Sequence, residues 1–267
     1  MPWLQRLLDI QIKQRVIDDP RTCAKTFLGW PRGTVFQEVI AGGQANFDEP
    51  VGHLSGADRA LLYAKYNQER HLDELSHAFS QLFRSGKSYG DPLVIDLGCG
   101  PFTAGLSLAH TLGNKDVFHY YGVDHYQSMR SLGLELADAA KAEDALHQRT
   151  TYHFLQELDD VDFGPIRGSI TLFIASYLLA SPTLDIEALV RSMTDAHTRA
   201  SLGPAVVFYT NSSRPEARAK FPEFRARLID AGFELQVDSI ERFSDTDKKH
   251  LDIHYALFFK KANLTIR

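Results

Sequence analysis

From residue 92 onward, short apolar runs alternate with longer segments in which apolar residues recur every three or four positions. The short runs predict β-strands and the longer segments predict amphipathic helices. Because the two kinds of segment alternate, the pattern predicts an α/β fold, with a parallel sheet covered by helices on both faces. Strands are expected at residues 92–97, 117–124, 150–155, 168–179 and 204–211, and helices at 102–113, 125–143, 183–201 and 214–232.

The end of the chain breaks this alternation. Residues 233–243 and 252–261 both have the composition of strands, and no helical segment separates them. They should therefore pair antiparallel at the end of the sheet. Pro222 lies inside the preceding helical segment, where its missing N–H and its ring disrupt helix geometry, so this helix should kink or split.

The N-terminal part has a different pattern, of helices and irregular loops. We therefore expect two parts: a helical cap at residues 1–90, which selects the substrate, and an α/β domain at residues 91–267. Residues 33–56 of the cap are rich in glycine, and they form either a mobile lid or a surface connection.

The clearest helix of the N-terminal part is predicted at residues 55–86. Ser55 and Asp58 have the spacing of a capping box, in which the hydroxyl and the carboxylate satisfy free N–H groups of the first turn. Gly86 is a natural end for this helix.

The composition is ordinary for a soluble globular protein, with 44% hydrophobic and 24% charged residues among 267. No apolar run approaches the roughly 20 residues that span a bilayer, and the N-terminus lacks the features of a secretory signal. Cys23 and Cys99 are too few and too far apart for a disulfide framework, so we expect a cytoplasmic protein without a metal site. The net charge of −5 argues against strong non-specific binding to nucleic acid, although a local basic patch stays open.

Polar residues and glycines follow the predicted strands. In an open α/β sheet, ligands bind outside the carboxyl ends of the strands, and glycines there let the backbone approach a ligand. An acid about 20 residues beyond such a loop suits the two hydroxyls of a ribose. The residues in question are Asp96, Gly98, Cys99, Gly100 and Pro101 after the first strand, Asp124 after the second, Gln156 and Glu157 after the third, and Ser176 and Tyr177 after the fourth.

The segment "VIDLGCGPFTAG", followed by "YYGVD", resembles the first two motifs of class I S-adenosylmethionine-dependent methyltransferases. The resemblance covers about residues 90–261. It implies a seven-stranded, mostly parallel, doubly wound sheet with an antiparallel final strand. It also implies S-adenosylmethionine as the cofactor and methyl transfer to an unidentified acceptor.

The resemblance implies a role for each matching position. Asp96 would orient the loop and approach the amino-acid part of the cofactor, and Gly98 and Gly100 would let the methionine part lie against the backbone. Asp124 would bind both ribose hydroxyls, and Gln156 or Glu157 would face the adenine amino group. The remaining predicted neighbours of the cofactor and of the reacting methyl group are Cys99 and Pro101 in the loop, His125 beside the adenine, and Ser176 and Tyr177 beside the sulfonium.

Tyr66 and Arg70 are also expected at the cofactor. Tyr63, Asn67 and Arg70 share one face of the helix at 55–86, and a face like this could close over the cofactor. Arg70 would then reach the methionine carboxylate, although a solvated helix face explains the same spacing. Tyr177 and His254 are the candidate catalytic residues. Alternatively, Tyr177 is an aromatic residue packed under a helix, and His254 is a hydrogen-bonded histidine in a strand.

Phe102 stands where the usual methyltransferase pattern has a third glycine. It packs beneath the loop and leaves the site open, or it stands in the site and blocks it. A blocked site would favour a non-catalytic partner subunit, and an NAD(P)-dependent oxidoreductase is the third hypothesis. A pyrophosphate usually needs all three glycines, so Phe102 weighs against a nicotinamide cofactor. The methyl acceptor stays open between a small molecule, RNA and a protein.

Overall fold

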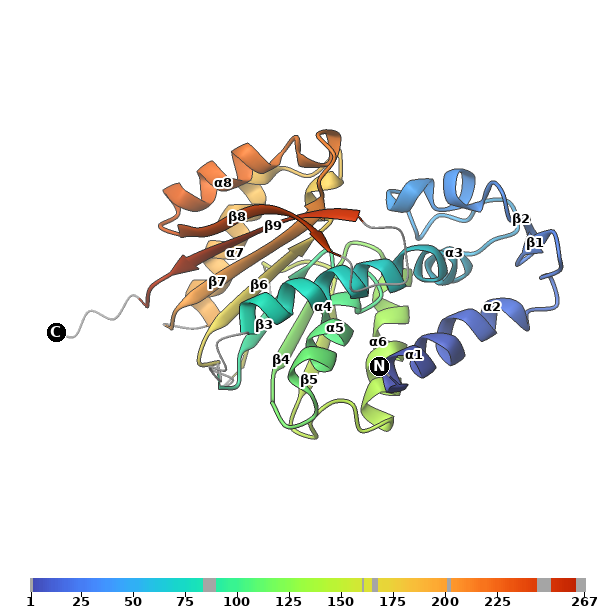
Figure 1. Cartoon of the computed structure of the whole chain (residues 1–267), viewed down its shortest axis with the longest axis horizontal. Helices are drawn as coiled ribbons and strands as arrows, with labels where there is room; N and C mark the ends of the chain where they lie inside the picture. The colour runs from blue at the N-terminus through green and yellow to red at the C-terminus, as the bar shows by residue number, and fades with distance from the viewer. Residues whose placement is uncertain are drawn as a thin grey trace.

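The main sheet has seven strands in the order β5-β4-β3-β6-β7-β9-β8 (Figure 1). The final strand, β9, runs antiparallel to both of its neighbours, and the other pairs of adjacent strands are parallel. This confirms the seven-stranded, mostly parallel sheet with an antiparallel final strand. The strands are β3 (Leu93–Leu97), β4 (His119–Val123), β5 (Thr151–Leu155), β6 (Thr171–Ser176), β7 (Ala205–Ser212), β8 (Glu234–Phe243) and β9 (Leu251–Lys260).

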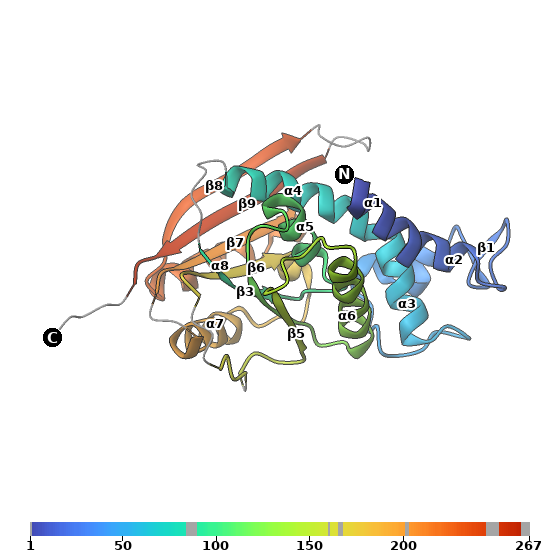
Figure 2. The same ribbon diagram turned by 90° about the horizontal axis from the view of Figure 1, so that it is seen from below.

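The computed structural model describes residues 2–83, 90–159, 161–164, 168–200, 203–243 and 251–262. Helices cover both faces of the sheet, with α4, α5 and α6 on one face and α7 and α8 on the other (Figures 1 and 2). The α-helices are α1 (Pro2–Leu8), α2 (Arg15–Ile17), α3 (Gly56–Tyr63), α4 (Glu69–Phe83), α5 (Thr103–Leu112), α6 (Gln127–Ala142), α7 (Ile186–Ala200) and α8 (Phe221–Asp230). The expected end of the helix at Gly86 lies outside the described residues.

Strand β3 shows how the sequence builds the two layers. Its side chains alternate between the faces, as in any strand. Leu93 and Ile95 pack with α7 and α8, whereas Val94 packs with the helices of the opposite face. All three are fully buried. The uninterrupted apolar run therefore reflects a central strand that is covered on both faces.

Pro222 splits the last helical segment, as predicted. A short 3₁₀ helix at Glu216–Arg218 precedes α8, and α8 begins at Phe221 with the proline in its first turn. A proline is tolerated there because the first N–H groups of a helix have no partner within the helix.

The N-terminal part shares a hydrophobic core with the sheet. Leu4, Leu8 and Phe47 belong to the same buried cluster as Val94 and Phe208. The residues on the two sides of position 90 thus pack into one common core. Whether position 90 is a domain boundary stays a prediction.

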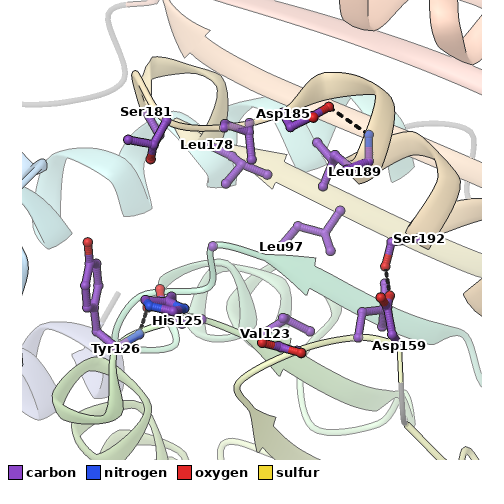
Figure 3. Close-up of a pocket in the computed structure, with 17 residues that line it drawn as sticks. Leu97, Val123, His125, Tyr126, Asp159, Leu178, Ser181, Asp185, Leu189 and Ser192 are labelled. Carbon is purple, nitrogen blue, oxygen red and sulfur yellow. Dashed lines mark hydrogen bonds between the residues drawn. The ribbon is translucent and has the colours of Figure 1, made fainter.

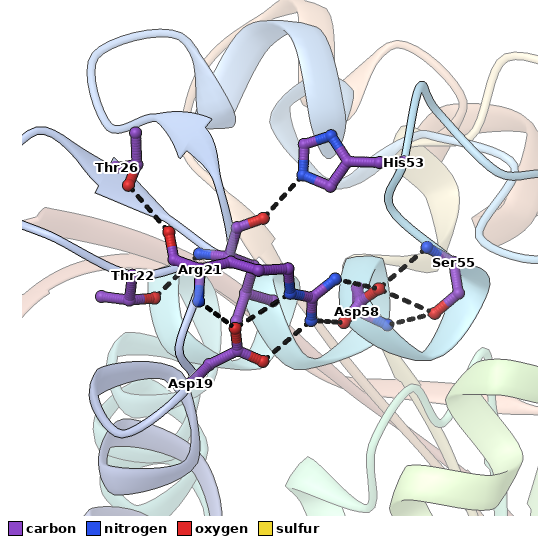
Figure 4. Close-up of polar contacts among 8 residues, drawn as sticks. Asp19, Arg21, Thr22, Thr26, His53, Ser55 and Asp58 are labelled. Atoms are coloured by element: carbon purple, nitrogen blue, oxygen red, sulfur yellow. Dashed lines mark hydrogen bonds and ion pairs between the residues drawn. The ribbon is translucent and has the colours of Figure 1, made fainter.

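The helix predicted at 55–86 is interrupted by a π-helical segment. It consists of α3, the π-helix η4 (Ala64–Gln68) and α4. Ser55 and Asp58 form the predicted capping box. Asp58 also accepts two hydrogen bonds from Arg21, whose guanidinium reaches back to Asp19 as well (Figure 4). This ion-pair cluster holds the short β1–β2 hairpin (Thr26–Phe27 and Trp30–Pro31) near the start of α3.

The glycine-rich residues 33–56 are more than a surface connection. They contain a π-helix, η2 (Val35–Val39), and a 3₁₀ helix, η3 (Ala41–Gly43). Val35, Val39 and Ile40 are fully buried. The buried Arg59 donates to the carbonyl of Val39 through Nε (3.0 Å) and Nη2 (2.7 Å), and through Nη1 to two further carbonyls of the segment. A buried guanidinium needs such partners, so Arg59 fixes the path of this segment.

Phe102 packs beneath the loop after β3. Its side chain is fully buried, and its ring contacts Tyr120 edge-on at a centroid distance of 4.8 Å. Its backbone adopts the left-handed conformation (φ +63°), which the usual glycine adopts at lower cost. Phe102 therefore belongs to the core and leaves the cleft above the loop open.

The ring of Phe102 requires a glycine at position 105. A Cβ added to Gly105 would lie 1.9 Å from the Phe102 ring. We expect Gly105→Ala to destabilise the chain by about 2–3 kcal/mol, because the ring must leave its place in the core. Urea denaturation measures this change. Gly33→Ala is the matched control, since nothing lies within 4 Å of a Cβ there. Equal stabilities of the two variants would contradict this packing.

Candidate functional site

The loop after β3 is fastened to the carboxyl end of β4. The N–H groups of Gly98 and Cys99 both donate to the carbonyl of Val123, at 2.8 and 3.0 Å. The N–H of Gly100 donates to Oδ2 of Asp124 at 3.0 Å. Gly98 and Gly100 reach this arrangement with left-handed backbones (φ +67° and +52°), which glycine adopts at little cost. Three consecutive N–H groups of the loop are therefore engaged within the protein.

Asp124 lies at the point where β4 meets this loop. Its Oδ1 accepts the N–H of Tyr126 at 2.9 Å, so each carboxylate oxygen has one backbone donor. Burial raises the pKa of Asp124 above its ordinary value. A carboxylate has about four lone-pair positions, so Asp124 can still accept two further hydrogen bonds.

A cleft of about 610 Å³ lies at the carboxyl ends of the strands, and we call it the strand-end cleft (Figure 3). It is bounded by the ends of β3, β4, β5 and β6 and by the start of α7. Leu97, Val123, Leu178 and Leu189 form apolar walls. None of the described residues that line the cleft is Lys or Arg. Four carboxylates line it: Asp124, Glu157, Asp159 and Asp185.

Gly98 lines both the strand-end cleft and a narrow crevice, of about 20 Å³, beside it. Asp96 lies in the wall of this crevice and is almost completely buried. The hydroxyl of Tyr120 donates to Oδ2 of Asp96 at 2.6 Å. Burial nevertheless raises the pKa of Asp96 to about 7. The loop and Tyr63, His71 and Ser176 complete the crevice.

A third cavity, of about 750 Å³, lies on the other side of Tyr63 and His71, which line both it and the crevice. We call it the side pocket. Its walls come from four parts of the chain. They are the segment from Phe36 to Gln44, one face of the helix at 56–83, the end of β6, and the residues from Asn211 to Ala217 after β7, with Asp252 at the edge. The π-helix η4 lies at this wall, and π-helical turns are frequent at functional sites.

Tyr177 holds a strained position between the crevice and the side pocket. It is a non-glycine residue with a left-handed backbone (φ +59°), and it ends β6 earlier than the predicted strand at 168–179. Its ring stacks on His71 at a centroid distance of 4.1 Å. Burial, together with a hydrogen bond to Glu74, holds the pKa of the Tyr177 hydroxyl well above its usual range. The hydroxyl is therefore protonated near neutral pH.

Several predicted residues meet around these cavities. Asp124, His125 and Glu157 line the strand-end cleft, and Asp96, Cys99 and Ser176 line the crevice. Gly98 lines both of these, Gly100 lines the crevice, and Arg70 and Tyr177 line the side pocket. Their functional roles stay predictions.

Other predicted residues lie elsewhere. His254 is fully buried between the sheet and α8, where its Nε2 lies 2.8 Å from Oδ1 of Asp238 and its ring packs on Phe221. Tyr66 donates to the carbonyl of Arg32, and it lines none of the three cavities. Gln156 is exposed, and it also lines none of them.

Pro101 is buried, and its carbonyl accepts a hydrogen bond from Gln68 at 2.8 Å. The residue ties the loop to the helix above it. Like Tyr66, His254 and Gln156, it does not line the strand-end cleft, the crevice or the side pocket.

Several residues of these walls were not predicted from the sequence. His71 and Glu74 continue the helix face that carries Arg70, so the same spacing could have indicated them. Asp159 and Asp185 gave no such signal. Asp159 follows β5 and accepts from Ser192, and Asp185 accepts the N–H of Ala188 in the first turn of α7 (Figure 3). In the sequence, Asp159 has the features of an ordinary loop residue and Asp185 those of a helix cap. Only the folded structure shows that both line the strand-end cleft.

Cys23 and Cys99 are not disulfide-bonded. Among the described residues, no group of three or more His, Cys, Asp and Glu side chains is placed to hold a metal ion. In the same part of the chain, no helix is both long and apolar enough to cross a membrane.

Comparison of the sequence with protein families gives no match, and comparison with curated proteins gives none either. Solved structures with a similar fold include magnesium protoporphyrin IX methyltransferase from Synechocystis with bound S-adenosylmethionine. It is 12% identical, with a TM-score of 0.47 over 85% of this chain and 94% of that one.

Two further solved structures illustrate the same similarity. One is a TehB-like S-adenosylmethionine-dependent methyltransferase from Corynebacterium glutamicum, at 15% identity and TM-score 0.46 over 76% of this chain and 97% of that one. The other is an S-adenosylmethionine-dependent methyltransferase from Methanosarcina mazei, at 14% identity and TM-score 0.45 over 68% of this chain and 98% of that one. At these identities the similarity is one of fold alone.

The raised pKa of Asp96 has a consequence for stability. The folded chain keeps the proton on Asp96 up to about pH 7, whereas the unfolded chain releases it near 3.8. The folded state therefore binds more protons between these values, and its stability falls as the pH rises through them.

We expect Asp96→Asn to remove this part of the pH dependence, because Asn cannot ionise and still accepts the Tyr120 hydroxyl. Urea denaturation of both proteins at about pH 5 and about pH 8 measures the difference. The wild-type chain should lose more stability than the variant between the two conditions. The same loss in both would contradict a protonated Asp96.

Proposed function

We propose that this protein is a cytoplasmic S-adenosylmethionine-dependent methyltransferase. The observation that carries the proposal is the charge of the strand-end cleft. Four carboxylates and no described Lys or Arg line a cleft at the carboxyl ends of the strands, where open α/β sheets bind ligands. Such a cleft favours a cationic cofactor without phosphate groups over an anionic dinucleotide.

The loop after β3 supports the same choice. A pyrophosphate would need the N–H groups of this loop, and those of Gly98, Cys99 and Gly100 already donate to Val123 and Asp124. An NAD(P)-dependent oxidoreductase is therefore less well supported. Phe102 lies in the core, so it no longer favours a non-catalytic subunit with a blocked site.

The residues at the site fit S-adenosylmethionine. Asp124 would hold the ribose hydroxyls with its remaining lone pairs, and His125 and Glu157 would lie toward the adenine. A Cβ at Gly98 would come within 3.0 Å of Leu178 and would narrow the passage from cleft to crevice. Asp96 offers a buried carboxylate for the ammonium group, and Arg70 remains the candidate for the methionine carboxylate.

S-adenosylmethionine would supply an activated methyl group on its sulfonium. The protein's part is then to align the acceptor, which we place in the side pocket because Tyr63 and His71 border both that pocket and the crevice. Nη2 of Arg70 lies 3.0 Å from Nε2 of His71, and an arginine N–H can only donate. Nε2 of His71 would accept this hydrogen bond, and the His71 ring stacks on the ring of Tyr177.

We expect Asp124→Ala to weaken the binding of S-adenosylhomocysteine at least about tenfold, because the ribose hydroxyls lose their acceptor. Isothermal titration calorimetry measures the dissociation constants. Asp195→Ala, which removes an exposed carboxylate on α7 that lines none of the three cavities, is the control and should bind as well as wild type. Absence of binding to the wild-type chain, or binding of NADH instead, would refute the proposed function.

The affinity for the cofactor should also depend on pH. Because the pKa of Asp96 is about 7, the carboxylate that would pair with the ammonium group is mostly protonated below neutral pH. Affinity should therefore rise about tenfold between about pH 6 and about pH 8, and Asp96→Asn should flatten this rise. If Asp96→Asn keeps the pH dependence of the wild-type affinity, the ammonium group does not bind at Asp96.

A further inference from the structure

We propose that the methyl acceptor is a small molecule with a carboxylate group, bound in the side pocket with Asn67 and Arg214 as donors. This inference rests on the proposed function, because it assumes that the methyl group is delivered at the boundary between the crevice and the side pocket. It names the class of acceptor, which the fold alone does not indicate.

The size and enclosure of the side pocket favour a small molecule. Its volume of about 750 Å³ falls within the range of roughly 300–1,000 Å³ that is usual for small-molecule sites. The wall formed by residues 36–44 is fixed, since Gln44 donates to the carbonyl of Ala180 at 3.2 Å and Arg59 holds the carbonyl of Val39. The Gln44 contact joins the N-terminal wall to the 3₁₀ helix η5 (Leu178–Ala180), which follows β6.

The acids that line the side pocket have partners or face solvent. Glu74 accepts a hydrogen bond from Tyr177 and lies 3.6 Å from Nε of Arg70. Asp252 lies 3.4 Å from Nε of Arg242. Glu216 is exposed at the edge, where water solvates it. The pocket therefore has little uncompensated negative charge to attract an amine.

Two hydrogen-bond donors of the side pocket, on Asn67 and Arg214, have no acceptor among the described residues. The side chain of Asn67 is only 3% exposed, and its Nδ2 has no acceptor. This nitrogen faces the N-terminal wall, because a Cβ added to Gly43 would lie 3.7 Å from it. Arg214 is exposed at the edge of the pocket, where water solvates its guanidinium, and the described residues provide no acceptor for it. A buried N–H without a partner is rare in folded proteins, so a ligand oxygen is the expected partner of Asn67.

A carboxylate suits this pair of donors best. Arg214 supplies a positive charge for which the structure describes no ion-pair partner, and hydrogen bonds to a carboxylate are stronger than those to neutral oxygens. The rings of Phe36, Tyr63 and Tyr177 line the same pocket and can pack against the apolar part of the ligand. Benzoate, which joins a ring to a carboxylate, is therefore a suitable probe.

The experiment titrates benzoate, benzyl alcohol and benzylamine into the full chain, with and without saturating S-adenosylhomocysteine, and detects binding by ligand-observed NMR. We expect benzoate to bind at least tenfold more tightly than either of the other two, with S-adenosylhomocysteine present. Arg214→Gln and Asn67→Leu should each weaken benzoate at least fivefold. Arg149→Gln is the matched control, because it removes an exposed guanidinium at the opposite edge of the sheet and should change nothing.

Asn67→Asp distinguishes the loss of a hydrogen-bond donor from a folding defect in Asn67→Leu. It should weaken benzoate and strengthen benzylamine, which a merely damaged pocket would not do. Tighter binding of benzylamine to the wild-type chain, or benzoate binding that neither Asn67→Leu nor Arg214→Gln changes, would overturn the proposal. So would displacement of benzoate by S-adenosylhomocysteine, which would place the carboxylate in the cofactor site, or by a short oligouridylate, which would indicate an RNA acceptor.

The binding of S-adenosylhomocysteine alone is measured first. If it fails while benzoate still depends on Arg214, the proposed function is wrong and the carboxylate site stands. If it succeeds while benzoate fails, only the acceptor class is wrong.

Discussion

The attachment of the loop after β3 to the end of β4 determines the rest of the site. Three successive N–H groups, those of Gly98, Cys99 and Gly100, donate to Val123 and Asp124. The loop therefore has none of these donors left for a phosphate, and Asp124 is held at the mouth of the cleft. The same turn directs the ring of Phe102 away from the cleft and into the core, at the cost of a left-handed backbone.

The cavities on the two sides of this loop differ in charge and in construction. The strand-end cleft is made by the sheet and α7, and four carboxylates lie among its apolar walls. The side pocket is made in equal parts by the N-terminal part and by residues after position 176, and its buried polar groups include a donor, Asn67, without an acceptor. Tyr63 and His71 line both the side pocket and the crevice, and Tyr177 stacks on His71. The proposed methyl transfer would take place at this boundary.

Most of the fold was predictable because each strand and helix carries its own local signal. The alternation of apolar runs with helical periodicity indicated the parallel sheet, the missing last helix indicated the antiparallel pair, and Pro222 indicated the break before α8. The site was less predictable. Asp159 and Asp185 make local hydrogen bonds that would explain them without the cleft. Tyr66 donates to the carbonyl of Arg32, whereas Tyr63, Asn67 and Arg70 line the side pocket.

The sequence by itself determined the α/β fold class and placed acids and glycines at the carboxyl ends of the first two strands, because these depend on periodicity and on neighbouring residues. Only the tertiary structure decided where Phe102 packs, that His254 lies in the core, and that residues 33–56 form the wall of a pocket. Each of these depends on contacts between residues far apart in the chain. Arg59 shows the reason, since its guanidinium fixes the wall only once folding brings the carbonyl of Val39 to it.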